Sequence, residues 1–156
     1  DLGFRFVGSE MFLRDSNKGA AVFTKALFDT GNLLSDGFSD TPVIIAERSV
    51  VKKLVPEGIF SFIDGEAALP INADDGSIRL IPAGTVGGES ILRAVLIDSV
   101  TVIGKKEARE VKNVILAESK TPFSSGDYSV LLGPKIFEIR EGNQKNERAK
   151  KTAGKD

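Results

Sequence analysis

The feature that most constrains the fold of this chain is the distribution of its apolar residues. Most of them lie in short runs rich in Val, Ile, Leu and Phe, and Gly, Pro, Asn, Asp and Ser separate the runs. Runs of this kind, bounded by turn residues, are typical of β-strands. The pattern predicts strands over residues 11–14, 20–28, 42–46, 78–82, 91–97, 100–103, 111–117 and 128–132.

Two segments depart from the strand pattern. Residues 47–55 carry Val50, Val51, Leu54 and Val55 at helical spacing, and Pro56 ends the pattern. Residues 134–139 form a candidate short helix, because a proline is accepted in the first turn. The apolar run 59–63 receives no assignment. We therefore expect a mainly β fold with one helix near 47–55 and a short one near 134–139.

Composition removes several classes of function. The chain has 156 residues, which suits one domain, and its formal net charge is −1, which gives no reason to expect nucleic-acid binding. It contains neither His nor Cys, so catalytic triads, thiolate nucleophiles and zinc sites built on these side chains are excluded. We expect no metal and no cofactor. Acid–base chemistry falls to Asp, Glu, Lys or Tyr, and paired carboxylates become the leading candidate for hydrolysis.

One aspartate follows an apolar strand and opens a turn. The stretch is Phe28, Asp29, Thr30, Gly31 and Asn32. A carboxylate at such a strand end can accept backbone N–H groups, and glycine permits their close approach. The Thr hydroxyl can hold the loop rigid. Asp-Thr-Gly after an apolar strand resembles the catalytic motif of aspartic peptidases, which implies that Asp29 is catalytic and that Thr30, Gly31 and Asn32 support the loop.

Two later motifs extend this resemblance to the retropepsin-like aspartic peptidases. Leu131, Leu132 and Gly133 resemble the apolar-apolar-Gly segment that packs behind the catalytic loop, just before a short helix. A glycine-rich stretch between two predicted strands resembles the tip of the flap hairpin that closes over a substrate; it comprises Val86, Gly87 and Gly88. The order of these motifs along the chain implies a closed β-barrel with a flap.

The catalytic motif occurs once, although the chemistry of aspartic peptidases needs two carboxylates that share one proton. Asp98 and Ser99 begin like a second copy, but Val100 stands where the glycine should be, and Asp64 is followed by glycine without a hydroxyl residue. We expect Asp98 to be a strand-end or turn residue. The second Asp29 must come from a second copy of the chain, which predicts a twofold homodimer with the site on its axis.

A longer stretch resembles a particular family, the sporulation sigma-E factor processing peptidases of endospore-forming bacteria. Their Asp-Thr-Gly-Asn, a following Leu and a Pro-Val-apolar strand correspond here to residues 29–46, and an arginine-bearing strand into Ile-Pro corresponds to 78–82. The family's Asp-Pro turn is Asp36-Gly37 in this chain. Asn32 is the position that separates this family from viral relatives, which usually carry Ala there.

The resemblance implies a biological setting. The substrate would be the inactive precursor of a sporulation sigma factor, cut in the mother cell to remove its amino-terminal pro-segment. An amino-terminal multi-span membrane domain would anchor the peptidase domain at the cytoplasmic face of a membrane, and a forespore-derived signalling protein would control activity. Residues 1–139 would be the peptidase domain, cut away from its anchor, which fits the non-Met start. Residues 140–156 are polar, and we expect a disordered tail.

One alternative comes from a different class of function. The same barrel could serve as a non-catalytic binding or dimerisation module, with Asp29 as a structural turn residue. The approach of two Asp29 side chains across a dimer would distinguish the two hypotheses.

Overall fold

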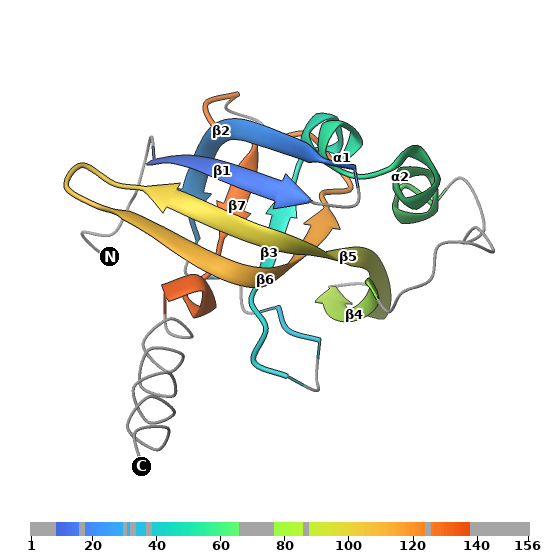
Figure 1. The fold of residues 1–156 in the computed structure, drawn as a ribbon. Coiled ribbons are helices and arrows are strands. Elements are labelled where there is room, and N and C mark those ends of the chain that lie inside the picture. Colours follow the sequence, from blue (N-terminus) through green and yellow to red (C-terminus); the bar gives the residue numbers. More distant parts are fainter. Residues whose placement is uncertain are drawn as a thin grey trace, which may run out of the picture.

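A computed structural model describes residues 9–15, 18–29, 31, 34–36, 39–65, 77–85, 88–123 and 126–137. Its elements, in chain order, are β1 (Ser9–Asp15), β2 (Ala20–Phe28), β3 (Val43–Ala46), α1 (Arg48–Leu54), α2 (Glu57–Ile63), β4 (Ile78–Thr85), β5 (Gly88–Ile103), β6 (Ala108–Glu118) and β7 (Val130–Leu132) (Figure 1). The predicted mainly β fold is confirmed.

Six of the strands close into a barrel. Their order is β1-β2-β7-β3-β6-β5, and β5 pairs with β1 again, from Glu10↔Ile103 to Arg14↔Ser99. β4 stands outside this ring and pairs only with the first half of β5. Closing a sheet removes its free edges, which is one way in which β proteins avoid uncontrolled pairing.

The barrel interior follows from the alternation of side chains along each strand. In β1, Met11 and Leu13 are fully buried, whereas Phe12 and Arg14 point outwards. The run 114–117 in β6 is buried on both faces. Val114 and Leu116 belong to the barrel core, whereas Ile115 and Ala117 belong to a second, smaller cluster on the other side of the strand. A continuous apolar run is what a strand covered on both sides requires.

The last strand, β7, lies between two strands that come early in the chain. It runs parallel to β2, with Leu131 opposite Leu27, and antiparallel to β3, with Leu131 opposite Ile45. It is drawn in orange between β2 and β3 in Figure 1. The two early strands are therefore joined through a segment from the end of the described chain.

The strand β5 is longer than the sequence predicts. We expected two strands, over 91–97 and 100–103, but β5 is continuous because its first half forms a hairpin with β4 and its second half completes the barrel. The expectation that Asp98 is a strand-end or turn residue is consequently wrong. Asp98 lies within β5, between two residues that both pair with β6, and its side chain is exposed.

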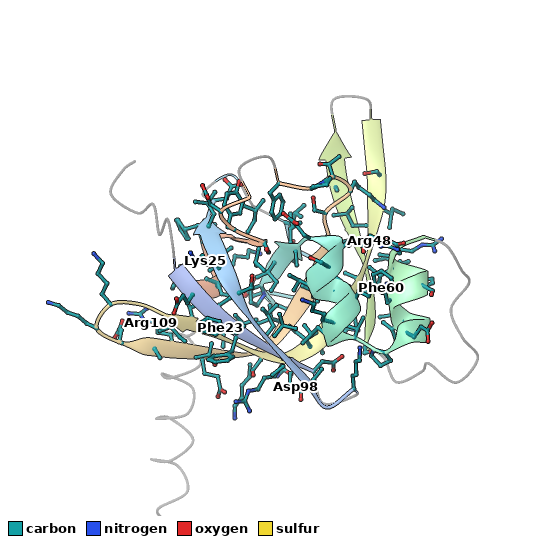
Figure 2. The ribbon with its side chains drawn as sticks, turned by 90° about the horizontal axis from the view of Figure 1, so that it is seen from above. Phe23, Lys25, Arg48, Phe60, Asp98 and Arg109 are labelled. Atoms are coloured by element: carbon teal, nitrogen blue, oxygen red, sulfur yellow. The ribbon has the colours of Figure 1, made fainter. Side chains whose placement is uncertain are left out.

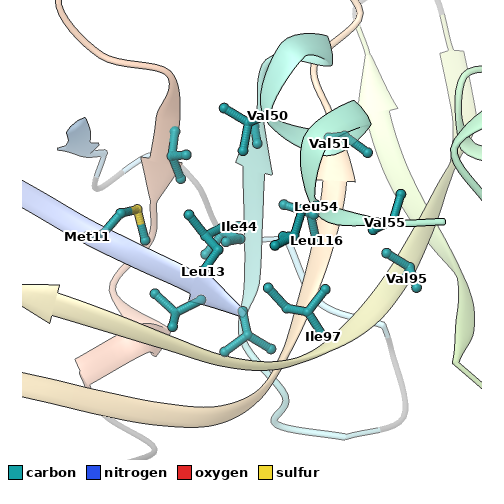
Figure 3. Close-up of a cluster of buried hydrophobic side chains, with 14 of the residues drawn as sticks. Met11, Leu13, Ile44, Val50, Val51, Leu54, Val55, Val95, Ile97 and Leu116 are labelled. Atoms are coloured by element: carbon teal, nitrogen blue, oxygen red, sulfur yellow. The ribbon is translucent and has the colours of Figure 1, made fainter. Parts of the chain in front are cut away.

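Two helices lie together beside the barrel and add to its core. The predicted helix 47–55 is confirmed as α1, whose Val50, Val51 and Leu54 are buried. A seven-residue helix is marginal by itself, so packing stabilises it (Figure 3). The expectation of a single helix before residue 134 is wrong, because α2 follows Pro56 and buries Ile59, Phe60 and Ile63 against the same core.

The segment after β7 turns helical at once. Residues 135–137 are helical, and the Ile136 and Phe137 amides donate to the carbonyls of Gly133 and Pro134 at 3.2 and 3.1 Å. Residues 138 and 139 of the predicted helix, and the predicted tail 140–156, lie outside the described residues.

Candidate active site

Asp29 directly follows β2, at the point where that strand meets the end of β7. Phe28 is the last residue of β2 and pairs with Leu132, and the Asp29 amide then donates to the Leu132 carbonyl at 2.7 Å. The backbone beneath the carboxylate is therefore fixed by a bond to a distant strand. The Asp29 residue itself is half-buried.

A backbone amide holds the Asp29 carboxylate. The Gly31 N–H donates to Asp29 Oδ1 at 2.9 Å. A Cβ atom built on Gly31 would lie 3.2 Å from the same oxygen, which is closer than ordinary van der Waals contact. Glycine therefore permits the approach that the sequence predicts for this loop. The other two predicted loop residues, Thr30 and Asn32, lie outside the described residues.

The segment behind the Asp29 loop is built from β7 and the helical turn. Leu132 and Gly133 are buried, and Leu131 is half-buried. The Phe28 and Phe137 rings lie 5.5 Å apart, so the helical turn contacts the strand that carries Asp29. The guanidinium of Arg109, a residue of β6, lies 6.0 Å from the centre of the Phe137 ring.

Asp36 lies in the loop that follows the motif, where the sequence predicts only a turn. Asp36 is buried; its Oδ1 accepts the Ser39 amide at 2.8 Å, and its Oδ2 accepts the Ser39 hydroxyl at 2.7 Å. An Asp three residues before a Ser is a recognisable signal for such a side-chain-to-backbone turn. Asp36 thus fixes the approach to β3.

The β4–β5 hairpin lies near Leu34 in the loop after Asp29. Ile81 and Leu92 of the hairpin share the smaller cluster with Leu34 of that loop. The pairing ends at Thr85 and Gly88, and Gly88 has a φ of 126°, which favours glycine. Val86 and Gly87, predicted with Gly88 as the tip, lie outside the described residues. Leu80 and Ile91 are 56% and 64% exposed, so the hairpin also presents apolar surface.

Two carboxyl groups meet at another place in the barrel, with an arginine beside them. We call this group, Glu118, Asp64 and Arg48, the Glu118 cluster. Glu118 ends β6 and is buried. Burial and a hydrogen bond with Asp64 raise the pKa of Glu118 from its ordinary 4.5 to about 7, and the positive charges of Arg48 and Lys120 limit the rise. The Arg48 Nε lies 3.2 Å from Asp64 Oδ1. Sequence reasoning missed this cluster, because no local signal joins three residues so far apart in the chain.

The Glu118 cluster is separate from Asp29. One row of paired residues crosses the sheet through Ala26, Val130, Ala46 and Glu118. Glu118 is thus three strands from β2, and Asp29 is three residues further along β2, a separation of roughly 15 Å by strand geometry. Among the described residues, no group of three or more His, Cys, Asp or Glu side chains is placed to hold a metal ion.

The closed barrel, the hairpin beside it and the strand-end aspartate define a retropepsin-like fold. The comparison with protein families gives a more specific result. Residues 14–136 match the model of the family described as sporulation factor SpoIIGA, and the chain belongs to this family.

Two relatives agree with the family assignment. A protein of Priestia megaterium (strain ATCC 12872 / QMB1551), named sporulation sigma-E factor-processing peptidase, is 28% identical over 124 residues, covering 75% of this chain and 40% of that protein. A protein of Bacillus thuringiensis subsp. kurstaki, named putative sporulation sigma factor-processing peptidase, is 31% identical over 118 residues, covering 71% of this chain and 73% of that protein. The match thus spans well under half of the first relative.

Across the described ranges, no helix is both long and apolar enough to pass through a membrane.

Proposed function

We propose that this chain is an aspartic endopeptidase domain whose active site forms when two copies meet with their Asp29 residues together. The observation that carries the proposal is the placement of Asp29. It stands at a strand end, half-buried, with its carboxylate held by the Gly31 amide at 2.9 Å, in a chain that has one Asp-Thr-Gly. The membership of the SpoIIGA family and the names of both relatives as peptidases support it.

The chemistry needs two carboxyl groups with different charge. When two Asp29 carboxyl groups meet, repulsion keeps one proton on the pair. The ionised carboxylate acts as the general base that activates a water molecule, and the protonated one donates a hydrogen bond to the scissile carbonyl. In each chain, the Gly31 amide orients the carboxyl group of Asp29. In this proposal Thr30 and Asn32 complete the loop, and the β4–β5 hairpin, with Val86, Gly87 and Gly88 at its tip, covers the bound peptide.

The proposed substrate is the inactive precursor of a sporulation sigma factor, which loses an amino-terminal pro-segment. The printed names of the relatives support this substrate class. In the full-length protein, an amino-terminal membrane domain would anchor the peptidase domain, residues 1–139, at the cytoplasmic face of a mother-cell membrane. Anchoring in one membrane would raise the local concentration of the two copies and so favour the dimer. A forespore-derived signalling protein would promote the active dimer through this membrane domain.

The test is cleavage of a purified sigma factor precursor by the purified chain, with the cut mapped by mass spectrometry. We expect one defined cut near the precursor's amino terminus. The activity per chain should fall as the enzyme is diluted, because the active species is a dimer, and analytical ultracentrifugation should show association over the same concentrations. Full activity in a strictly monomeric sample would contradict the shared site.

A mixing experiment gives a sharper result. Wild-type chain is titrated with Asp29→Asn chain at constant total concentration, and the cleavage rate is followed. For a shared dyad, the rate falls with the square of the wild-type fraction, because mixed dimers are inactive. A linear fall would mean that each chain acts alone. No cleavage by any sample, dimeric samples included, would favour the non-catalytic module.

A further inference from the structure

Arg93 joins the β4–β5 hairpin to helix α2. Its Nη1 donates to the Phe62 carbonyl at 3.0 Å, and its guanidinium carbon lies 4.6 Å from the centre of the Phe62 ring. Arg93 belongs to β5 and pairs with Leu80 of β4, close to the base of the hairpin. One side chain from the hairpin thus makes both a directed hydrogen bond and a cation–π contact with the last turn of the helix.

Helix α2 is itself fixed to the barrel. Ile59, Phe60 and Ile63 are buried in the barrel core. At the end of the helix, Arg48 pairs with Asp64 and lies 5.1 Å from the centre of the Phe60 ring (Figure 2). The helix is therefore held to the barrel by contacts that do not involve Arg93, and the Arg93 contact links the hairpin to this anchored helix.

The geometry separates this contact from the hairpin tip. Gly88 is five residues along β5 from Arg93, a distance of about 17 Å in an extended strand. Arg93 therefore lies away from the hairpin tip, and any effect on a peptide covered by the tip would pass through the hairpin. A lysine cannot reproduce the contact, because it lacks the planar group that stacks on the ring while donating to the carbonyl.

We propose that Arg93 is a positioning residue, which holds the β4–β5 hairpin against α2 at the angle at which the hairpin covers a bound peptide. The inference rests on the proposed peptidase function. The insertion of α1 and α2 between β3 and β4 then has a role beyond filling the core, because it supplies the support from which the hairpin is held.

The test compares Arg93→Met with Arg93→Lys, Phe62→Leu and the double variant Arg93→Met/Phe62→Leu. Arg14→Met, an exposed arginine on β1, is the charge-matched control. For cleavage of the sigma factor precursor, Arg93→Met should raise KM by about five- to tenfold with kcat within about twofold of wild type. The KM of Arg93→Lys should lie between those of wild type and Arg93→Met. Phe62→Leu should raise KM less than Arg93→Met, because it removes the ring contact but keeps the backbone carbonyl that Arg93 also bonds. The double variant should resemble Arg93→Met, because Arg93→Met already removes both contacts.

Hydrogen exchange gives a readout that needs no substrate. In Arg93→Met, amides of β4 and the first half of β5 should exchange faster than in Arg14→Met, while amides of β1 and β2 stay unchanged. An unchanged KM, a fall in kcat alone, additive effects in the double variant, or faster exchange throughout the barrel would each overturn the proposal. If Arg93→Met does not fold, Arg93→Lys and Phe62→Leu carry the same comparison.

The two proposals fail in different ways. Asp29→Asn with wild-type activity would remove the peptidase proposal, whatever Arg93 does. Loss of activity in Asp29→Asn, together with Arg93→Met indistinguishable from Arg14→Met in both KM and exchange, would remove the Arg93 proposal alone. The dimer association constant is measured for every variant, so that a change in KM is not mistaken for weaker dimerisation.

Discussion

Two carboxyl sites at different places in this barrel differ in what surrounds them. Asp29 is held by a backbone amide at a half-buried strand end. In the Glu118 cluster, by contrast, two carboxyl groups of one chain meet each other with Arg48 beside them. The comparison teaches that shared protons serve two purposes. The pair completed within one chain ties α2 to the end of β6, whereas the proposed pairing of Asp29 with its counterpart in a second copy would make activity depend on assembly.

The largest expected difference between the sites concerns activity. Asp29→Asn should reduce cleavage at least about 1,000-fold, because it removes the general base, and should leave the unfolding temperature nearly unchanged. Glu118→Gln is the matched control, since it makes the same change of acid to amide in the other site. Precursor cleavage and thermal unfolding are measured for both. Equal loss of activity in the two variants would contradict the distinction.

The second difference concerns stability and its dependence on pH. Because the pKa of Glu118 is raised from 4.5 to about 7, the folded state binds a proton more tightly than the unfolded state. The stabilisation that protonated Glu118 provides is complete below about pH 4.5 and is lost as the pH rises to 7, with a change of about 3 kcal/mol at most.

Glu118→Gln tests this pH dependence, because an amide stays neutral and can still donate to Asp64. Denaturant unfolding at pH 5 and pH 8 should show a smaller difference for the variant than for wild type, with the variant the more stable protein at pH 8. An unaltered pH profile in Glu118→Gln would assign the dependence to other groups.

The third prediction concerns the space around Asp29. Gly31→Ala places a methyl group against a carboxylate oxygen that a Cβ would approach to 3.2 Å. The carboxylate must shift by a few tenths of an ångström, and we expect cleavage to fall by about tenfold with little change in stability. Ala at the exposed Gly84, where a Cβ meets nothing within 4 Å, serves as the control for stability. Full activity in Gly31→Ala would show that the carboxylate tolerates the shift.

The smallest expected effect is that of Arg48→Met. The Arg48 side chain is 55% exposed, so its ion pair with Asp64 and its contact with the Phe60 ring together contribute about 1 kcal/mol or less. The loss should be greater at pH 8 than at pH 5, because ionised Asp64 and Glu118 then repel each other without a nearby guanidinium. Chemical denaturation at both pH values measures it, and a loss that does not vary with pH would contradict the coupling.

Local patterns predicted the parts of the fold that depend on neighbouring residues. The alternation in β1, the helical spacing of α1 and the strand before Asp29 were all visible in the sequence. Helix α2 was missed because residues 59–63 are apolar with little polar interruption, so periodicity cannot separate a buried helix from a buried strand. The length of β5 was missed because Asp98 and Ser99 look like a break, although pairing on both sides carries the strand through them.

The site residues also divide into those that a local sequence pattern can indicate and those that depend on contacts between distant parts of the chain. The motif around Asp29 is recognisable in the sequence because strand, aspartate and glycine are adjacent in the chain, and the catalytic role of Asp29 stays a prediction. Asp64, Glu118 and Arg93 meet their partners only through folding, which brings together the end of α2, β6 and β5. Single-sequence patterns carry no information on such pairs. The roles of all the site residues named from the resemblance stay predictions, and Thr30, Asn32, Val86 and Gly87 also lie outside the described residues.

The position of β7 has a consequence for how the chain folds. β2 and β3 do not pair with each other, and both pair with residues 130–132. The barrel therefore cannot close until a segment about a hundred residues later has been inserted between them, and contacts of such long range are slow to form. The Asp29 amide bonds Leu132 of the same late segment, so we expect the Asp29 loop to become fixed when β7 is inserted. Amides of β2 and β3 should gain protection together in the slowest refolding phase, which pulsed hydrogen exchange measures.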